Sequence, residues 1–170
     1  MDELYILRHG IAVEHGAPGT PDDERPLTPR GRRRMRQIAR GLRRLELGLD
    51  RIVTSPLPRA RSTAEIAAEE LGAEDLLEEA EVLRAGSDAP AIRDWLRTRT
   101  EARLMIVGHN PALSDLIALL VLGDGNRSWP GPRLCELKKG GLAALCSSGD
   151  ASDRFDIAWV ATPRLIRRML

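Results

Sequence analysis

Short apolar runs alternate along this chain with longer segments of helical periodicity, and this alternation limits the fold more than any other feature. The apolar runs cover residues 4–7, 51–54, 104–107, 141–145 and 155–160. Runs of this length that are bounded by turn or helix signals are typical of buried strands. Strands on either side of a helix favour right-handed parallel crossovers. The pattern therefore predicts an α/β fold, with a mostly parallel central sheet flanked by helices.

Four segments between these runs carry helical patterns. In the first, Met35, Ile38 and Leu42 recur at spacings of three and four, while arginines between Arg32 and Arg44 occupy the other positions. This is the pattern of an amphipathic helix whose charged face is solvated. The second pattern follows Pro58, and the third covers residues 89–98. The fourth opens at residues 110–111, where asparagine suits an N-cap and proline suits the first helical position. Residues 123–132 are expected to form a loop.

Length and composition indicate one domain spanning residues 1–170. The chain is 42% apolar and 30% charged, and no repeat or linker divides it. No window of eighteen uncharged apolar residues exists and no signal peptide is recognisable, so we expect a cytoplasmic protein without a membrane partner. The formal net charge of +1 does not favour nucleic acid. Cys135 and Cys146 lack metal-ligand spacing and are expected to be reduced.

Three unusual clusters follow three of the predicted strands. They are Arg8-His9-Gly10, the segment from Ser55 to Arg59, and Gly108-His109-Asn110. Because ligands bind at the carboxyl ends of strands in an open parallel sheet, we expect these clusters to converge into one site. Gly10 permits a close turn beside His9, and free amides at a helix start favour an anion. Two arginines and two histidines at such a position favour phosphate as the ligand.

These clusters also resemble the motifs of the histidine phosphatase superfamily, which has the phosphoglycerate-mutase-like fold. The resemblance rests on the three clusters, extended by Ala60, Thr63, Ala64 and Pro111, and it spans most of the chain. Within the superfamily, the chain resembles the SixA-type phosphohistidine phosphatases. The segments that carry this closer resemblance are 25–31, 137–140 and 163–165.

The resemblance implies a role for each site residue. His9 is implied to attack phosphorus and form a phosphohistidine intermediate that water hydrolyses. Arg8 and Arg59 are implied to hold phosphate oxygens, and His109, as an imidazolium, to stabilise transition-state charge. Asn110 is expected to join them in binding phosphate. The arginines supply the charge that a metal supplies elsewhere, and no carboxylate cluster has metal-ligand spacing, so no metal or cofactor is expected.

Several positions leave alternatives open. Arg25 either reaches the pocket or pairs with a neighbouring acidic residue. Glu81 precedes an apolar pair and is either a general acid or a residue of a strand, while Asp88 is either a general acid or a helix cap. Ser55 lacks an obvious partner base and is expected in a turn. His15, in a polar loop, is expected to be solvated.

Three functions remain open from the sequence. A phosphatase acting on phosphohistidine of a protein, with phosphate as product, is favoured over a small-metabolite phosphomonoesterase or mutase-like enzyme. The reason is that Ile11 and Ala12 replace the hydroxyl-bearing continuation seen in mutase and sugar-phosphatase relatives. A non-catalytic module that binds a phosphorylated ligand is the third candidate.

Overall fold

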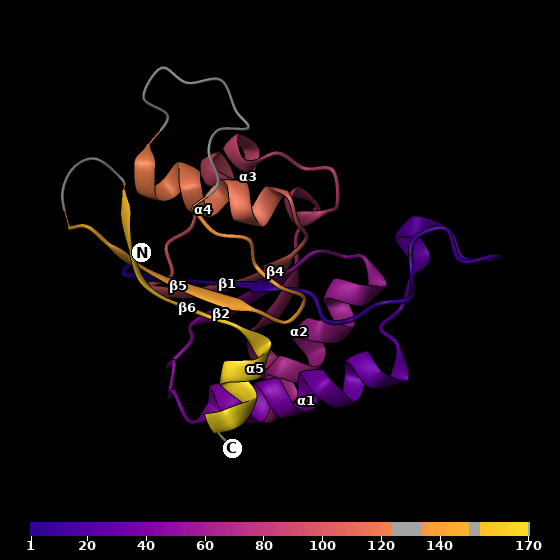
Figure 1. Ribbon diagram of the computed structural model, residues 1–170. Coiled ribbons are helices and arrows are strands. Elements are labelled where there is room, and N and C mark those ends of the chain that lie inside the picture. The colour runs from indigo at the N-terminus through magenta and orange to yellow at the C-terminus, as the bar shows by residue number, and fades with distance from the viewer. Residues whose placement is uncertain (124–133, 150–153, 170) are drawn as a thin grey trace.

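The central sheet has six strands within the part of the chain that the computed structural model describes, residues 1–123, 134–149 and 154–169 (Figure 1). The strands are ordered β3-β2-β4-β1-β5-β6. β1, β2, β3 and β4 run parallel, and β5 is antiparallel to both of its neighbours. Their bounds are Glu3–Arg8 (β1), Arg51–Thr54 (β2), Leu77–Glu79 (β3), Arg103–Gly108 (β4), Leu142–Ser147 (β5) and Phe155–Ala161 (β6). The predicted α/β class with a mostly parallel sheet is confirmed.

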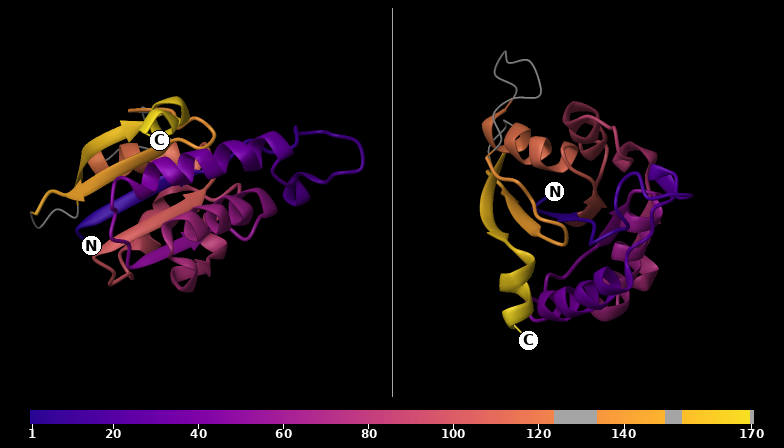
Figure 2. Two further views of the ribbon diagram at one scale, coloured as in Figure 1. Left: turned by 90° about the horizontal axis from the view of Figure 1, so that it is seen from below. Right: turned by 45° about the vertical axis from the view of Figure 1, so that its right-hand side comes forward.

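Helices cover both faces of the sheet, with α1, α2 and α5 on one face and α3 and α4 on the other (Figures 1 and 2). Their bounds are Pro29–Arg43 (α1), Pro58–Leu71 (α2), Ala89–Leu96 (α3), Ala112–Leu122 (α4) and Pro163–Ile166 (α5). Side chains alternate between the two faces of a strand. Tyr5 and Leu7 of β1 therefore enter the core under α1 and α2, while Leu4 and Ile6 enter the core under α3 and α4.

The helix α1 shows how local sequence sets an element and its orientation. The side chain of Thr28 accepts a hydrogen bond from the Gly31 amide at 2.9 Å, which makes Thr28 the N-cap, and Pro29 occupies the first turn. Met35, Ile38 and Leu42 are buried as their spacing predicts, and most of the arginines of α1 are exposed. The helix begins at Pro29, several residues before the first apolar residue of the pattern, Met35. The reason is that the N-cap Thr28, and not the apolar spacing, sets where the helix starts.

Two expectations about local structure need correction, and one strand was not expected. The helix α4 begins at Ala112 with Pro111 as its N-cap, so Asn110 does not cap it. The Asn110 side chain instead donates to the Leu137 carbonyl at 3.2 Å. The strand β3 was not predicted, because three residues are too few for a visible alternation. Glu81 lies in a short 3-10 helix, Glu81–Leu83, rather than on a strand.

Two further expectations concern the loop and the membrane. The predicted loop at 123–132 falls outside the described residues except for Gly123. Among the helices of the described segments, none is long and apolar enough to cross a membrane.

Candidate active site

The carboxyl ends of three neighbouring strands bring the sequence clusters together. His9 follows β1, Ser55 follows β2 and His109 follows β4, and β1 and β2 both pair with β4. The backbone hydrogen bonds of the sheet continue past the strand ends. The His9 amide donates to the Gly108 carbonyl at 3.1 Å, and the Ser55 amide donates to the Val107 carbonyl at 2.9 Å. The ring centroids of His9 and His109 are 5.1 Å apart. The convergence that the sequence predicted is thus present.

His9 is held in one tautomer with one free ring nitrogen. The side chain is buried, and its Nδ1 lies 2.8 Å from the carbonyl oxygen of Gly10. Because a carbonyl oxygen can only accept, Nδ1 carries the proton and Nε2 keeps the lone pair. Burial, and then the charges of Arg59, Arg8 and Lys139, lower the pKa of His9 to about 3. His9 is therefore neutral at physiological pH, as a nucleophile must be.

His109 is also neutral when no phosphate is bound. Its Nε2 lies 2.8 Å from the Ser55 hydroxyl, and its buried Nδ1 has no hydrogen-bond partner. Burial, followed by His9 and the positive charges of Arg59 and Arg25, lowers the pKa of His109 to about 3. A phosphate dianion beside the ring would favour the protonated form, so the charge on His109 depends on what the site holds.

Arg59 is buried, Arg8 is partly buried, and the hydrogen-bonding groups of both are only partly satisfied. Arg59 is 2% exposed and donates from Nη1 to the Asp22 carbonyl at 2.7 Å, while Arg8 donates from Nη1 to the Leu137 carbonyl at 2.6 Å. The Nε of each has no partner. A buried donor without an acceptor is costly, more so when it is charged. Phosphate oxygens are the acceptors that would satisfy these two guanidinium groups.

The Asn110 side chain is only partly used in this arrangement. Its Nδ2 donates to the Leu137 carbonyl at 3.2 Å, and its buried Oδ1 has no partner. An amide nitrogen carries two N–H groups, so one donor remains, while the amide oxygen can only accept. The phosphate-binding role of Asn110 stays a prediction.

A hydrogen-bonded frame fixes the turn around His9. The Thr63 hydroxyl donates to the Arg59 carbonyl at 2.7 Å and accepts from the Gly10 amide at 2.9 Å. The Gly140 amide is shared between the carbonyls of Arg8 and His9, at 3.0 and 3.1 Å. A Cβ atom at Gly10 would lie 3.3 Å from the Leu27 side chain, which would have to shift by a few tenths of an ångström. Thr63 thus ties the strand end of β1 to the helix α2.

Ser55 is a site residue that sequence reasoning dismissed. It is fully buried, and its hydroxyl contacts His109, which follows a different strand. The contact joins residues 54 positions apart, so the segment around Ser55 gives no local signal of it. Since the hydroxyl fixes one ring nitrogen of His109, Ser55 acts as a positioning residue for that ring.

Arg25 pairs with a neighbouring acid, which is one of the two alternatives that the sequence left open. Its Nε donates to the Asp22 carboxylate at 2.8 Å and its Nη1 to the Val13 carbonyl at 2.7 Å. Its charge also lowers the pKa of Arg59 and of His109, which places it at the border of the site. Arg25 is therefore paired with a neighbouring acid and close to the pocket.

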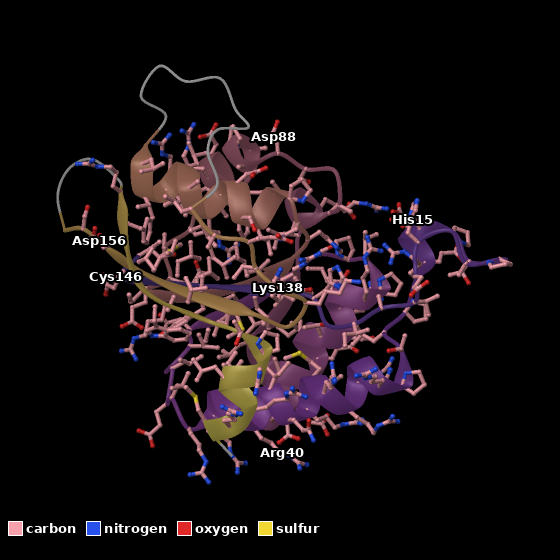
Figure 3. The ribbon with its side chains drawn as sticks, viewed as in Figure 1. His15, Arg40, Asp88, Lys138, Cys146 and Asp156 are labelled. Carbon is pink, nitrogen blue, oxygen red and sulfur yellow. The ribbon has the colours of Figure 1, made fainter. Side chains whose placement is uncertain are left out.

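Asp22, like Ser55, lies at the site although no sequence pattern indicated this. Its carboxylate is hydrogen-bonded to the exposed His15 as well as to Arg25, and it lies 3.5 Å from Arg59. These partners, with His15 the largest contribution, lower the pKa of Asp22 to about 2. Asp22 is ionised at neutral pH and cannot donate a proton. Figure 3 shows His15 on the segment that projects beyond α2.

The two candidate general acids, Asp88 and Glu81, make contacts away from the two histidines. The Asp88 carboxylate accepts from the Ala91 amide at 2.8 Å and caps α3 (Figure 3). The Glu81 side chain is 75% exposed and lies 3.4 Å from Arg84. Neither carboxylate has a hydrogen bond to His9 or His109, whose ring partners are Gly10 and Ser55. Across the described ranges, no three His, Cys, Asp or Glu side chains are grouped to hold a metal ion.

Burial of two neutral histidines makes folding stability depend on pH. An unfolded histidine has a pKa of about 6.5, while His9 and His109 fold with pKa values of about 3. As the pH falls below the unfolded value, the unfolded chain takes up protons that the folded chain does not, and stability is lost. We expect the free energy of unfolding to fall by about 2 kcal/mol per histidine between about pH 7 and pH 5.

Denaturant titrations at several pH values measure this dependence. The double variant His9→Gln, His109→Gln serves as the comparison, because it removes both groups and keeps polar side chains. Its stability should change less over the same range. An identical slope in the variant and the parent chain would show that these histidines are not buried as neutral groups.

Comparison with known proteins gives a family match and several relatives. Residues 4–84 match the model of the histidine phosphatase superfamily (branch 1). An uncharacterized protein from Picosynechococcus sp. is 38% identical over 149 residues, which are 85% of each chain. The phosphohistidine phosphatase SixA of Escherichia coli is 28% identical over 125 residues, covering 72% of this chain and 76% of that protein.

Mutase relatives match over a shorter region, and the fold match is more extensive. A protein of Escherichia fergusonii named "Probable phosphoglycerate mutase GpmB" is 38% identical over 81 residues, 46% of this chain and 36% of that protein. The structure of the protein histidine phosphatase SixA complexed with tungstate superimposes with a TM-score of 0.80 at 25% identity, covering 95% of this chain and 97% of that one. The likeness to SixA therefore extends over nearly the whole fold.

Proposed function

The chain belongs to the histidine phosphatase superfamily, and we propose that within it the protein hydrolyses phosphohistidine on other proteins through a phosphorylated His9. One observation carries this proposal. The carboxylates considered above as proton donors are either ionised, as Asp22 is, or engaged away from the histidines, as Glu81 and Asp88 are. A phosphatase with this arrangement suits a leaving group that needs no acid from the enzyme.

The first step forms the phosphoenzyme. The lone pair on Nε2 of His9 attacks phosphorus while the P–N bond of the substrate breaks, and the bonding electrons pass to the departing imidazole. If the departing ring is protonated at its distal nitrogen, it leaves as neutral imidazole. The positive charge then resides on the phosphorylated His9 ring, whose Nδ1 keeps its proton and donates it in a hydrogen bond to the Gly10 carbonyl.

The second step releases phosphate. A water molecule attacks phosphorus, the bond to Nε2 breaks, one proton passes to solvent and His9 returns to its neutral state. In both steps Arg8 and Arg59 hold the nonbridging oxygens, because each has a buried Nε without a partner. His109 lies across from His9 and stabilises the charge that gathers on these oxygens.

The chemistry of the leaving group separates the candidate substrates. An alkoxide from a serine or sugar phosphate is a strong base, and its departure normally needs a proton donor worth about a hundredfold to ten thousandfold in rate. Imidazole has a pKa of about 6.5 and can be protonated by water before it leaves. The arrangement of carboxylates in this structure therefore favours phosphohistidine over an alkyl phosphate.

A small-metabolite phosphatase or mutase-like enzyme is the second candidate. It is favoured by the shorter match to a phosphoglycerate mutase relative, and it needs an acid that Glu81 or Asp88 would have to supply by moving. A module that binds a phosphorylated ligand without turnover is the third, and tight phosphate binding with no hydrolysis would identify it.

A turnover panel in excess EDTA tests these candidates. The substrates are a phosphohistidine protein, a phosphoserine peptide, sugar phosphates and p-nitrophenyl phosphate, whose phenolate is also a good leaving group. We expect kcat/KM for phosphohistidine to exceed that for alkyl phosphates by about a hundredfold or more. Glu81→Ala and Asp88→Ala should each retain most of the activity. An alkyl phosphate as the best substrate, or a carboxylate as indispensable as His9, would support the metabolite phosphatase instead.

A further inference from the structure

The helices α1 and α5 lie next to each other (Figures 1 and 2). Residues of both helices line a cavity of about 630 Å³. It shares Arg8 and Gly10 with the active site, and Lys138 and Lys139, which precede β5, also line it. Figure 3 shows Lys138 near the centre of the molecule, above α5. A ligand bound in this cavity would therefore extend from the phosphate toward α5. We call it the α1–α5 cavity.

The rim of the α1–α5 cavity is basic. Arg34, Lys138, Lys139, Arg164 and Arg167 line it together with Arg8, and no acidic residue is part of the lining. Glu136 lies outside the lining, 3.8 Å from Lys138 and 4.0 Å from Arg8, with an exposed side chain. The charges of Arg30 and Arg167 lower the pKa of Arg34, so these cations repel one another. An anionic ligand would relieve this repulsion.

The floor of the same cavity is apolar. Ile11 and Pro163 belong to its lining and are partly exposed, so they offer apolar surface to an occupant. Met35 and Ile38 of α1 also border the cavity but are buried. An occupant that satisfies the whole cavity needs negative charges at its edge and an apolar group at its centre.

We propose that the α1–α5 cavity binds an acidic segment of the phosphorylated protein, with carboxylates on the basic rim and one apolar side chain on the floor. The proposal deepens the proposed function and rests on it for the phosphohistidine that enters the active site. The segment lies next to that phosphohistidine, because Arg8 belongs to both the clamp and the cavity.

A peptide fits this cavity better than other anions do. Inorganic polyphosphate would satisfy the rim but leave the apolar floor without a partner. Proteins that bind single-stranded nucleic acid stack bases on aromatic side chains, and no aromatic residue lines the cavity. The combination of separate positive charges around an apolar centre matches a peptide with acidic residues on both sides of an aliphatic one.

Binding of an unphosphorylated peptide tests the proposal without any turnover. The probe is a fluorescent peptide of alternating glutamate and leucine, and its anisotropy is measured at low salt. In the double variant Arg34→Gln, Arg164→Gln the Kd should rise about tenfold, because two exposed charge contacts are lost. The matched control is Arg36→Gln, Arg168→Gln, which removes two exposed arginines just outside the lining and should leave the Kd nearly unchanged.

Kinetics then separate this proposal from the proposed function. For a phosphohistidine protein with an acidic flank, the double variant should raise KM about tenfold and leave kcat in place, while p-nitrophenyl phosphate turnover stays unchanged. If no phosphohistidine is hydrolysed, the proposed function fails, and the peptide Kd still decides the role of the cavity.

Three results would overturn the inference. One is a neutral peptide that binds as tightly as the acidic one. Another is an equal loss of affinity in the control variant. The third is tripolyphosphate or single-stranded RNA that displaces the peptide and shows the same dependence on Arg34 and Arg164, which would assign the cavity to a phosphate polyanion.

Discussion

Replacement of His9 by alanine is expected to lower turnover by at least about a thousandfold and to remove the covalent phosphoenzyme. The physical reason is that His9 offers a lone pair on Nε2, fixed by the bond from Nδ1 to Gly10, inside a cluster of positive charge. The Nε2 of the other histidine, His109, is hydrogen-bonded to the Ser55 hydroxyl, so His109 is not placed to act as the nucleophile instead of His9. After a rapid neutral quench, mass spectrometry should locate an acid-labile, alkali-stable phosphoryl group on the His9 peptide of the parent chain.

The variant His15→Ala provides the matched control. It removes an exposed histidine that contacts Asp22, so phosphoenzyme formation should persist. Circular dichroism of the His9→Ala variant checks that the fold survives the loss of a buried ring. Full turnover by a folded His9→Ala variant, or a phosphoryl group trapped on a different residue, would contradict the assignment of His9 as the nucleophile.

Replacement of Arg59 by alanine is expected to lower kcat by about a hundredfold or more, the usual cost of removing an oriented donor that stabilises transition-state charge. Arg59 is buried and its Nε has no partner, so its positive charge acts with little screening by water. Arg59→Lys keeps the charge but loses the fork of donors, and it should recover only part of the rate.

Two controls separate catalysis from structure in this experiment. Arg61→Ala removes an exposed arginine of the same helix, paired with Glu79 at 2.7 Å, and should leave kcat unchanged. The charge of Arg59 lowers the pKa of both His9 and His109, so NMR titration of Arg59→Ala should show both pKa values raised. A rise in KM alone would mean that Arg59 only binds the substrate.

The sequence determined the fold class and the convergence of the candidate site residues because both depend on local patterns. Apolar runs alone located β1, β2 and β4 to within a residue at each end. The arginine-rich pattern identified α1, since burial of one face requires apolar residues at helical spacing. The carboxyl ends of parallel strands meet at one edge, so the positions of His9 and His109 after two such strands predicted that they would meet.

Tertiary structure decided what depends on contacts between distant segments. The free nitrogen of His9 follows from a turn that Thr63 and Gly140 hold in place, and the neutrality of His109 follows from its burial beside other cations. Neither Ser55 nor Asp22 carries a local pattern of its role, because each acts on a residue of another segment. Periodicity reports which face of an element is buried, but hydrogen-bond partners and pKa values depend on which elements pack together, and only the folded chain sets these.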